Sequence, residues 1–274
     1  MKGIEKQVEH NKRIMKRLME HKEYVERHGY ELVGIFVQGS QNYNLDVYDD
    51  DYMSDIDSKA IVLPKFEDFV DGKEPVSTTV VLDNNEHIDI KDIRTMFDVM
   101  KKSNINFLEI LFTDFYILNP KYSTEFKKVM DNAEKLAFAN MKALLNSICG
   151  MSMQKLVALK HPYPTIIDKI NKFGYDPKQL HHIYRLNQFL KSIIQGKSFK
   201  ECLTSVDKNL IDIKKGCLPL DVAESKAVEI NDETHELKAN FEKDKNFIVD
   251  LDAYNLYKEC KRDILRKWFK QELL

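Results

Sequence analysis

Residues 32–38, Leu-Val-Gly-Ile-Phe-Val-Gln, form a short apolar run that ends at Gly39. A run of this length, rich in β-branched side chains, is typical of a buried strand rather than a helix. Gly39 permits a sharp turn and a close approach of the backbone to a ligand. Ser40 follows, and the N–H groups and hydroxyl of such a turn can donate hydrogen bonds to phosphate oxygens. Taken alone, the Gly-Ser pair is better explained as an ordinary strand-ending turn.

Two carboxylates begin the next strand-like run, which extends from Asp55 to Pro64. Side chains alternate across a strand, so Asp55 and Asp57 point to the same face, roughly 6.6 Å apart along the chain. Two like charges on one face repel each other. A cation such as Mg²⁺, which prefers hard oxygen ligands, would remove this repulsion. The pair therefore indicates a cation site.

A third acid, Asp89, lies between two isoleucines, after a strand predicted over residues 78–82. If the segment that carries Asp89 lies beside the strand that carries Asp55 and Asp57, three carboxylates converge. Such a group can hold two cations roughly 3.5–4 Å apart, the arrangement used for in-line phosphoryl chemistry. The alternative is that all three acids are solvated residues at strand edges.

Gly39-Ser40, then Ser54-Asp55-Ile56-Asp57, then Asp89 in an apolar strand together resemble the DNA polymerase β nucleotidyltransferase superfamily. That family has a Gly-Ser turn, an Asp-x-Asp or Asp-x-Glu pair shortly after it, and a third acid in a later strand. The resemblance implies an α+β fold with a small mixed β-sheet flanked by helices.

Beyond Asn119-Pro120 almost every segment has helical spacing, which predicts an all-helical C-terminal lobe. We therefore expect two domains. The first is a nucleotidyltransferase catalytic domain over residues 1–118, and the second is a helical domain over residues 119–274 that binds substrate and nucleotide.

The resemblance also implies roles for the matching residues. Gly39 and Ser40 would hold the outer phosphates of ATP or another NTP. Asp55, Asp57 and Asp89 would bind two Mg²⁺ or Mn²⁺ ions, and Asp89 would help to deprotonate the acceptor. The implied reaction transfers a nucleoside monophosphate, with AMP favoured, to an acceptor hydroxyl and releases pyrophosphate. No covalent enzyme intermediate is expected.

One segment of the helical half carries a stripe of basic residues. Asp176 is a good N-cap and a proline follows it, so a helix is predicted to begin there. Lys178, His182 and Arg185 then fall at i, i+4 and i+7, on one side of the helix. Such a stripe of donors suits phosphates, with lysine as a point charge and arginine as a fork. His181 falls off the stripe.

A solvated basic face is the alternative reading of this stripe, and two observations favour a functional one. Between residues 160 and 200, eight Lys and Arg residues accompany only two acids, in a chain of net charge −2. The segment also resembles the Gly-Tyr-Asp-x-Lys-x-x-x-His-x-x-Arg-Leu pattern of a bacterial and phage subgroup of the superfamily, some members of which are associated with RNA repair. This resemblance implies that Lys178, His182 and Arg185 contact the nucleotide or the acceptor.

An RNA or tRNA end is the favoured acceptor, because the helical half is locally basic. A protein or small-molecule hydroxyl is the alternative, since Asp46, Asp49, Asp50 and Asp51 would repel a polyanion near the metals. This acidic loop over residues 46–53 is interpreted as a solvated loop rather than an accessory cation site or a site for a basic substrate. A catalytically silent nucleotide-binding protein, antitoxin-like or regulatory, is a further alternative, although a complete set of acids counts against it.

The predicted C-terminal helix combines aromatic and basic side chains between Tyr254 and Lys270. We interpret its basic side as the solvated surface of a packed helix, in preference to a nucleic-acid contact. The first thirty residues hold no continuous apolar stretch, which favours a cytoplasmic protein without a membrane partner. The four cysteines lie far apart, which argues against a zinc site and against a disulfide framework.

Overall fold

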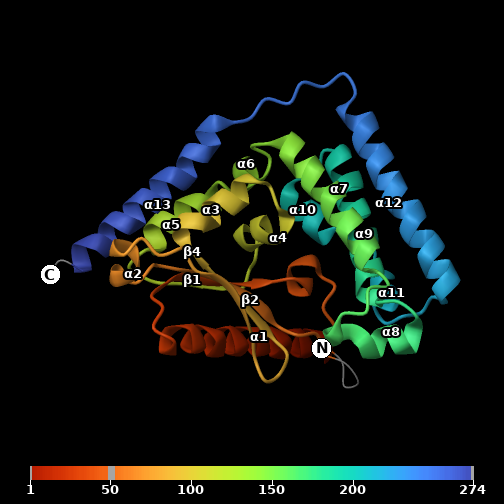
Figure 1. Ribbon diagram of the computed structural model, residues 1–274, viewed down its shortest axis with the longest axis horizontal. Helices are drawn as coiled ribbons and strands as arrows, with labels where there is room; N and C mark the ends of the chain where they lie inside the picture. Colours follow the sequence, from red (N-terminus) through yellow and green to blue (C-terminus); the bar gives the residue numbers. More distant parts are fainter. Residues whose placement is uncertain (1, 49–52, 273–274) are drawn as a thin grey trace. The chain divides into compact units, whose positions relative to one another are not determined.

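The computed structural model describes residues 2–48 and 53–272. Backbone contacts divide the chain into two compact units (Figure 1). The sheet unit comprises Met1–Asn42, Asp46–Ala139 and Asp250–Leu274, and the helical unit comprises Tyr43–Leu45 and Asn140–Val249. The fold is α+β, as the sequence predicts, with a mixed sheet and a helical region towards the C-terminus.

The sheet of the first unit has the strand order β3-β4-β2-β1-β5. The strands are β1 (Leu32–Gln38), β2 (Asp57–Val62), β3 (Ser77–Val81), β4 (His87–Asp92) and β5 (Tyr116–Leu118). The β2–β4 pair is parallel and the other three pairs are antiparallel. The predicted bounds of β1 are confirmed. The second strand begins later than predicted, because Asp55 precedes the hydrogen-bonded ladder.

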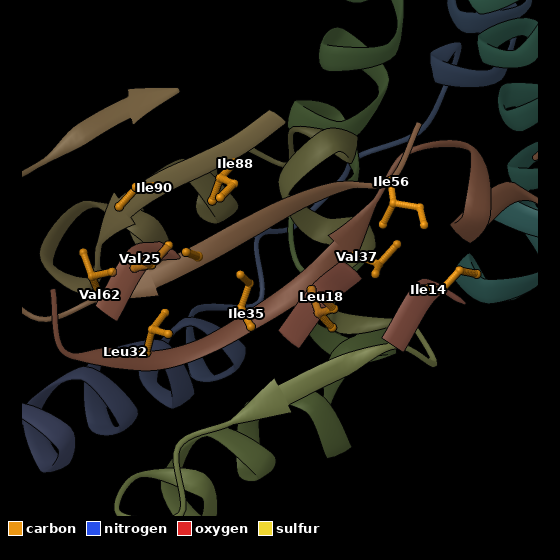
Figure 2. Packing of buried hydrophobic residues seen from close by; sticks show 11 residues of the cluster. Ile14, Leu18, Val25, Leu32, Ile35, Val37, Ile56, Val62, Ile88 and Ile90 are labelled. Carbon is orange, nitrogen blue, oxygen red and sulfur yellow. The ribbon is translucent and has the colours of Figure 1, made fainter. Parts of the chain in front are cut away.

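Helix α1 (Lys2–Arg27) covers one face of this sheet. Ile14, Leu18 and Val25 share one side of the helix because their spacing follows the helical period. They pack against alternate residues of the central strands, among them Ile35 and Val37 (Figure 2). All five side chains are almost completely buried, so this layer fixes the position of the strands that carry the candidate site.

The remaining helices of the sheet unit are α2 (Phe66–Val70), α3 (Ile93–Lys101), α4 (Ile105–Leu108), α5 (Ser123–Asp131), α6 (Ala133–Ala137) and α13 (Leu251–Glu272), with the short 3-10 turns η1 (Ser40–Tyr43), at its boundary with the helical unit, and η2 (Glu109–Leu111). Aromatic packing joins several of them. Phe126 of α5 lies 5.2 Å from Phe36 of β1 and 6.2 Å from Phe97 of α3, measured between ring centroids. Phe97 in turn stacks on Tyr257 of α13 at 4.9 Å.

This packing explains why the division into units differs from the domain boundary expected after residue 118. Residues 119–139 and 250–274 belong with the sheet, although their sequence pattern is helical. Phe36 alternates with residues that face α1, so α5 and its neighbours lie on the opposite face. Helical spacing identifies these segments as helices but does not say which core they complete.

The helical unit is built around α9 (Pro177–Ile194). Its other elements are α7 (Met141–Ala158), η3 (Pro164–Ile166), α8 (Ile167–Phe173), α10 (Phe199–Thr204), α11 (Leu210–Lys214) and α12 (Leu220–Glu242). The predicted start of α9 is confirmed, because the Asp176 side chain accepts a hydrogen bond from the backbone N–H of Lys178 at 3.0 Å. Over the described part of the chain, no helix is long and apolar enough to cross a membrane.

Candidate active site

The turn after β1 has the backbone that only glycine adopts easily. Gly39 has φ of +87°, and a Cβ added there would meet nothing within 4 Å. Backbone conformation rather than crowding therefore requires the glycine. Its N–H donates to Oε1 of the buried Glu109 at 3.2 Å. The half-buried Ser40 hydroxyl has no hydrogen bond to another residue in the described ranges, so a ligand can use it as a donor.

The turn and the first two acids lie at the same end of the sheet. Gln38, the last residue of β1, pairs with Asp57, the first residue of β2. The Gln41 side-chain amide donates to the backbone carbonyl of Asp55 at 2.7 Å. The two motifs, which the sequence places more than ten residues apart, are therefore in direct contact.

Asp57 and Asp89 point away from α1. Ile56, between Asp55 and Asp57, and Ile88, next to Asp89, belong to the core that α1 covers (Figure 2). Alternation along a strand then directs the carboxylates to the other face. Asp55 is exposed, whereas Asp57 and Asp89 are half-buried. Asp57 and Asp89 therefore share a face, whereas the common face expected for Asp55 and Asp57 stays a prediction, because Asp55 precedes the strand.

Asp89 is held by a residue that the sequence reading missed. The parallel register places Lys59 opposite Asp89, and the Lys59 ammonium lies 2.5 Å from Oδ2 of Asp89. The Lys59 side chain is only 5% exposed, and its Nζ lies 4.1 Å from the centroid of the Phe107 ring. Burial lowers the pKa of Lys59, and the carboxylate of Asp89 opposes that shift. The available signal was a lysine inside an apolar strand, two residues after Asp57.

Asp57 is bound differently. Its Oδ1 accepts a hydrogen bond from the backbone N–H of His87 at 2.8 Å and lies 3.1 Å from Nδ1 of the same histidine. The carboxylate nevertheless remains 27% exposed, so a ligand can reach it. Asp57 is therefore oriented by the neighbouring strand β4 and stays open on one side.

The donor set fits one divalent cation better than two. Asp55 and Asp57 offer hard oxygen ligands on an accessible face. Lys59 occupies Oδ2 of Asp89 and places a positive charge beside it, so Asp89 fits poorly as a metal ligand. Within residues 2–48 and 53–272, no three His, Cys, Asp or Glu side chains form a group that could hold a metal ion.

A buried network supports the acids from the α1 side. His21 contacts the Ser58 hydroxyl through Nδ1 at 2.9 Å and Oε2 of Glu86 through Nε2 at 3.0 Å. Arg17 also donates to Glu86 through Nε at 2.8 Å. Burial alone would raise the pKa of Glu86, but the hydrogen bonds from His21 and Arg17 outweigh it and lower the pKa to about 2. Glu86 accepts in addition from the backbone N–H of Ile56 at 3.3 Å, and so fixes the segment between the two acids.

In the helical unit, the residues of the predicted stripe on α9 become more buried from the start of the helix onwards. Lys178 is exposed, His182 is half-buried, and Arg185 is buried with its guanidinium 3.9 Å from the centroid of the Tyr43 ring. A solvated basic face is therefore the wrong description of Arg185. His181 lies off the stripe as expected. Its Nδ1 contacts the Leu210 carbonyl at 3.0 Å, and burial lowers its pKa to about 4.

Helix α7 adds a basic residue that the sequence reading did not place near the stripe. Burial, followed by the positive charges of Arg185 and Lys178, lowers the pKa of Lys155. Burial and then Arg185 also lower the pKa of His182. Basic groups from two packed helices thus lie close enough to repel one another. We call Lys155, Lys178, His182 and Arg185 the cationic cluster.

The acidic loop is only partly described. Asp46 pairs with Nε2 of His10, and the His10 ring stacks on Tyr48 with centroids 4.6 Å apart. Asp46 is thus tied to α1 rather than simply solvated. The predictions for Asp49, Asp50 and Asp51 lie outside the described residues.

The C-terminal helix α13 borders a cavity of about 830 Å³ with α2. Its lining combines aromatic and basic side chains: Phe69, Lys258, Lys261, Arg262, Leu265, Arg266, Trp268, Phe269 and Lys270. Trp268 is buried and lies 5.7 Å from Phe69, whereas Phe69 and Phe269 are 41% and 40% exposed. We call this cavity the α13 groove. The prediction of a packed helix is correct for Trp268, but the exposed aromatic rings distinguish this surface from a purely solvated side.

No protein-family model matches the chain, and no curated protein matches it significantly. Among solved structures, the chain is similar to a nucleotidyltransferase-like protein from Exiguobacterium sibiricum 255-15. The two share 11% sequence identity, the alignment covers 95% of this chain and 92% of that one, and the TM-score is 0.32. A likeness of this size does not establish a shared fold.

Proposed function

We propose that the protein is a metal-dependent nucleotidyltransferase that transfers a nucleoside monophosphate from an NTP to an acceptor hydroxyl, with release of pyrophosphate. The observation that carries the proposal is the meeting of two motifs at one end of the sheet. Asp57 pairs with the last residue of β1, and Gln41 of the Gly-Ser turn binds the backbone of Asp55. A turn with a free hydroxyl donor beside two hard oxygen ligands suits phosphoryl chemistry.

The residues of this face would have separate roles in binding the metal ion and the phosphates. Asp55 and Asp57 would hold Mg²⁺ or Mn²⁺, which when bound offsets the negative charge of the phosphates. The Ser40 hydroxyl would donate to an outer phosphate oxygen, because the Gly39 N–H already donates to Glu109. The role of Asp89 in deprotonating the acceptor stays a prediction, since Lys59 already occupies its Oδ2.

An RNA or tRNA end is the acceptor that we favour, with ATP as the nucleotide. The α13 groove supports this choice because single-stranded nucleic acids bind where bases stack on aromatic rings and basic side chains follow the phosphates. The cationic cluster of the helical unit suits a triphosphate or a nucleic-acid backbone for the same electrostatic reason. A protein or small-molecule hydroxyl is the alternative acceptor.

The proposal is tested with labelled NTPs, Mg²⁺ or Mn²⁺, and total RNA, followed by separation into RNA, protein and small-molecule fractions. We expect label in the RNA fraction and release of pyrophosphate. Asp55→Asn and Asp57→Asn should reduce both to background, whereas Asp71→Asn, at the exposed end of α2, should change neither. Full activity in the Asp55 and Asp57 variants would contradict the mechanism.

A catalytically silent nucleotide-binding protein is the second candidate, and the Lys59–Asp89 pair is the observation that favours it. A lysine on the third acid could stabilise the fold without any turnover. This candidate predicts that the wild-type protein binds an NTP but releases no pyrophosphate with any of the three acceptor fractions.

A further inference from the structure

The Lys59–Asp89 pair lies on the same sheet face as the proposed cation ligands. Lys59 follows Asp57 by two residues in β2, so both side chains point to that face. Asp89 is directly opposite Lys59 in the neighbouring strand. A fixed ammonium group therefore stands where the third acid would otherwise meet a second metal ion.

The Lys59–Asp89 ion pair is shielded from solvent and is costly to separate. The Lys59 and Asp89 side chains are 5% and 16% exposed, and their charged atoms are 2.5 Å apart. The Phe107 ring lies 4.1 Å from the ammonium and adds a cation–π contact. Separating two buried charges leaves each uncompensated, which is strongly unfavourable. A metal ion at Asp89 would have to expel Lys59 or lie next to its positive charge, and both are costly.

We propose that Lys59 takes the place of a second metal ion at Asp89, so that the chain binds one divalent cation, at Asp55 and Asp57, and supplies the second positive charge itself. The inference rests on the proposed function, because it concerns the cation site of that reaction. A lysine ammonium is a compact point charge that suits phosphate oxygens. Unlike a metal ion, it does not depend on free metal concentration and is not removed by a chelator.

Lys91 provides a matched control for Lys59. It lies on the same face of β4, two residues after Asp89, and its ammonium is 5.2 Å from the same Phe107 ring. Its hydrogen bond goes to the Ser77 hydroxyl at 2.6 Å and not to an acid. Lys91→Met therefore removes an equal charge from the same surroundings while it leaves Asp89 paired.

The experiment counts bound Mn²⁺ per chain by electron paramagnetic resonance, without nucleotide. For each protein, the Mn²⁺ bound by the same protein with Asp55→Asn and Asp57→Asn added is subtracted. This subtraction removes Mn²⁺ that is bound by other acids from the count. We expect one site in the wild type, one in Lys91→Met and two in Lys59→Met. Asp89→Asn should keep the single site with an affinity within about twofold of the wild type, far less than the tenfold change that 1.4 kcal/mol represents.

The outcomes separate this inference from the proposed function. Two sites in the wild type, one of which is lost in Asp89→Asn, would overturn the inference and leave the proposed function intact. No site in the wild type would contradict both. Circular dichroism confirms that each variant is folded. The wild-type count decides the question even if Lys59→Met does not fold.

Discussion

The sheet unit and the cationic cluster on α9 differ in how their charged side chains are arranged. In the sheet unit, two acids have a cationic partner from the chain itself: Lys59 for Asp89, and Arg17 for Glu86. On α9 and α7, basic groups lie near one another, and burial, followed by the charge of Arg185, lowers the pKa of both Lys155 and His182. An acid bound by a cation of the chain is held in place, whereas a group of neighbouring basic side chains is a surface that a bound anion stabilises.

The largest effect is expected where a buried ion pair of the sheet unit is broken. Glu86→Ala removes the shared partner of Arg17 and His21, both of which are then left with unmet polar groups. We expect a loss of about 3–5 kcal/mol in the free energy of unfolding, the usual cost of removing one member of a buried ion pair. Urea denaturation measures it.

The control for Glu86→Ala is Glu20→Ala, which removes the other carboxylate bound by Arg17. Glu20 is 38% exposed, whereas Glu86 is 4% exposed. Exposed ion pairs contribute little, so the change should stay below about 1 kcal/mol. Equal effects of the two substitutions would show that burial does not determine the strength of this network.

The same network predicts how stability depends on pH. The pKa of Glu86 is lowered from 4.5 to about 2 in the folded protein, so its contribution is complete above pH 4.5 and is lost as the pH falls towards 2. At 1.36 kcal/mol per pKa unit, the contribution is about 3 kcal/mol. Urea midpoints measured between pH 6 and pH 2.5 should therefore fall more steeply for the wild type than for Glu86→Gln. Parallel curves would exclude Glu86 as the group that titrates.

A smaller effect is expected from substitutions in the cationic cluster, and here the measured quantity is the affinity for a ligand. Arg185→Ala should weaken the binding of a nucleoside triphosphate about tenfold, or 1.4 kcal/mol, as measured by calorimetry. The loss of its contact with Tyr43 should cost about 1–2 kcal/mol of stability. Lys191→Ala, on the same helix but paired with Glu233, should change neither. A large loss of stability with unchanged affinity would make Arg185 a structural anchor only.

The smallest effect is expected at the periphery of the same cluster. Lys155→Met removes one charge on α7 that burial and its basic neighbours already disfavour. Binding of single-stranded RNA should weaken about threefold, and the slope of log affinity against log salt should fall by about 1. Filter binding over a range of salt concentrations measures both. An unchanged slope would place Lys155 outside the path of the phosphates.

Local rules in the sequence were sufficient for the features that depend on neighbouring residues. The bounds of β1 follow from a short apolar run that ends at a glycine, and the N-cap at Asp176 follows from helix capping. The partner of Asp89 could not be predicted in this way. Lys59 is 30 residues away, and the two meet only through the register of a parallel pair. The approach of Lys155 to α9 likewise depends on how two helices are rotated about their axes.

The grouping of α13 with the sheet has a consequence for the order of synthesis. The ribosome completes the helical unit at residue 249, before it has made the helix whose Tyr257 stacks on Phe97 of the sheet unit. The strands, which precede the helical unit in the chain, thus obtain their full core only after that unit has been made. Until the C-terminal helix arrives, the apolar surface around Phe97 lacks one of its covering layers, and nascent chains with such exposed surface are prone to aggregate.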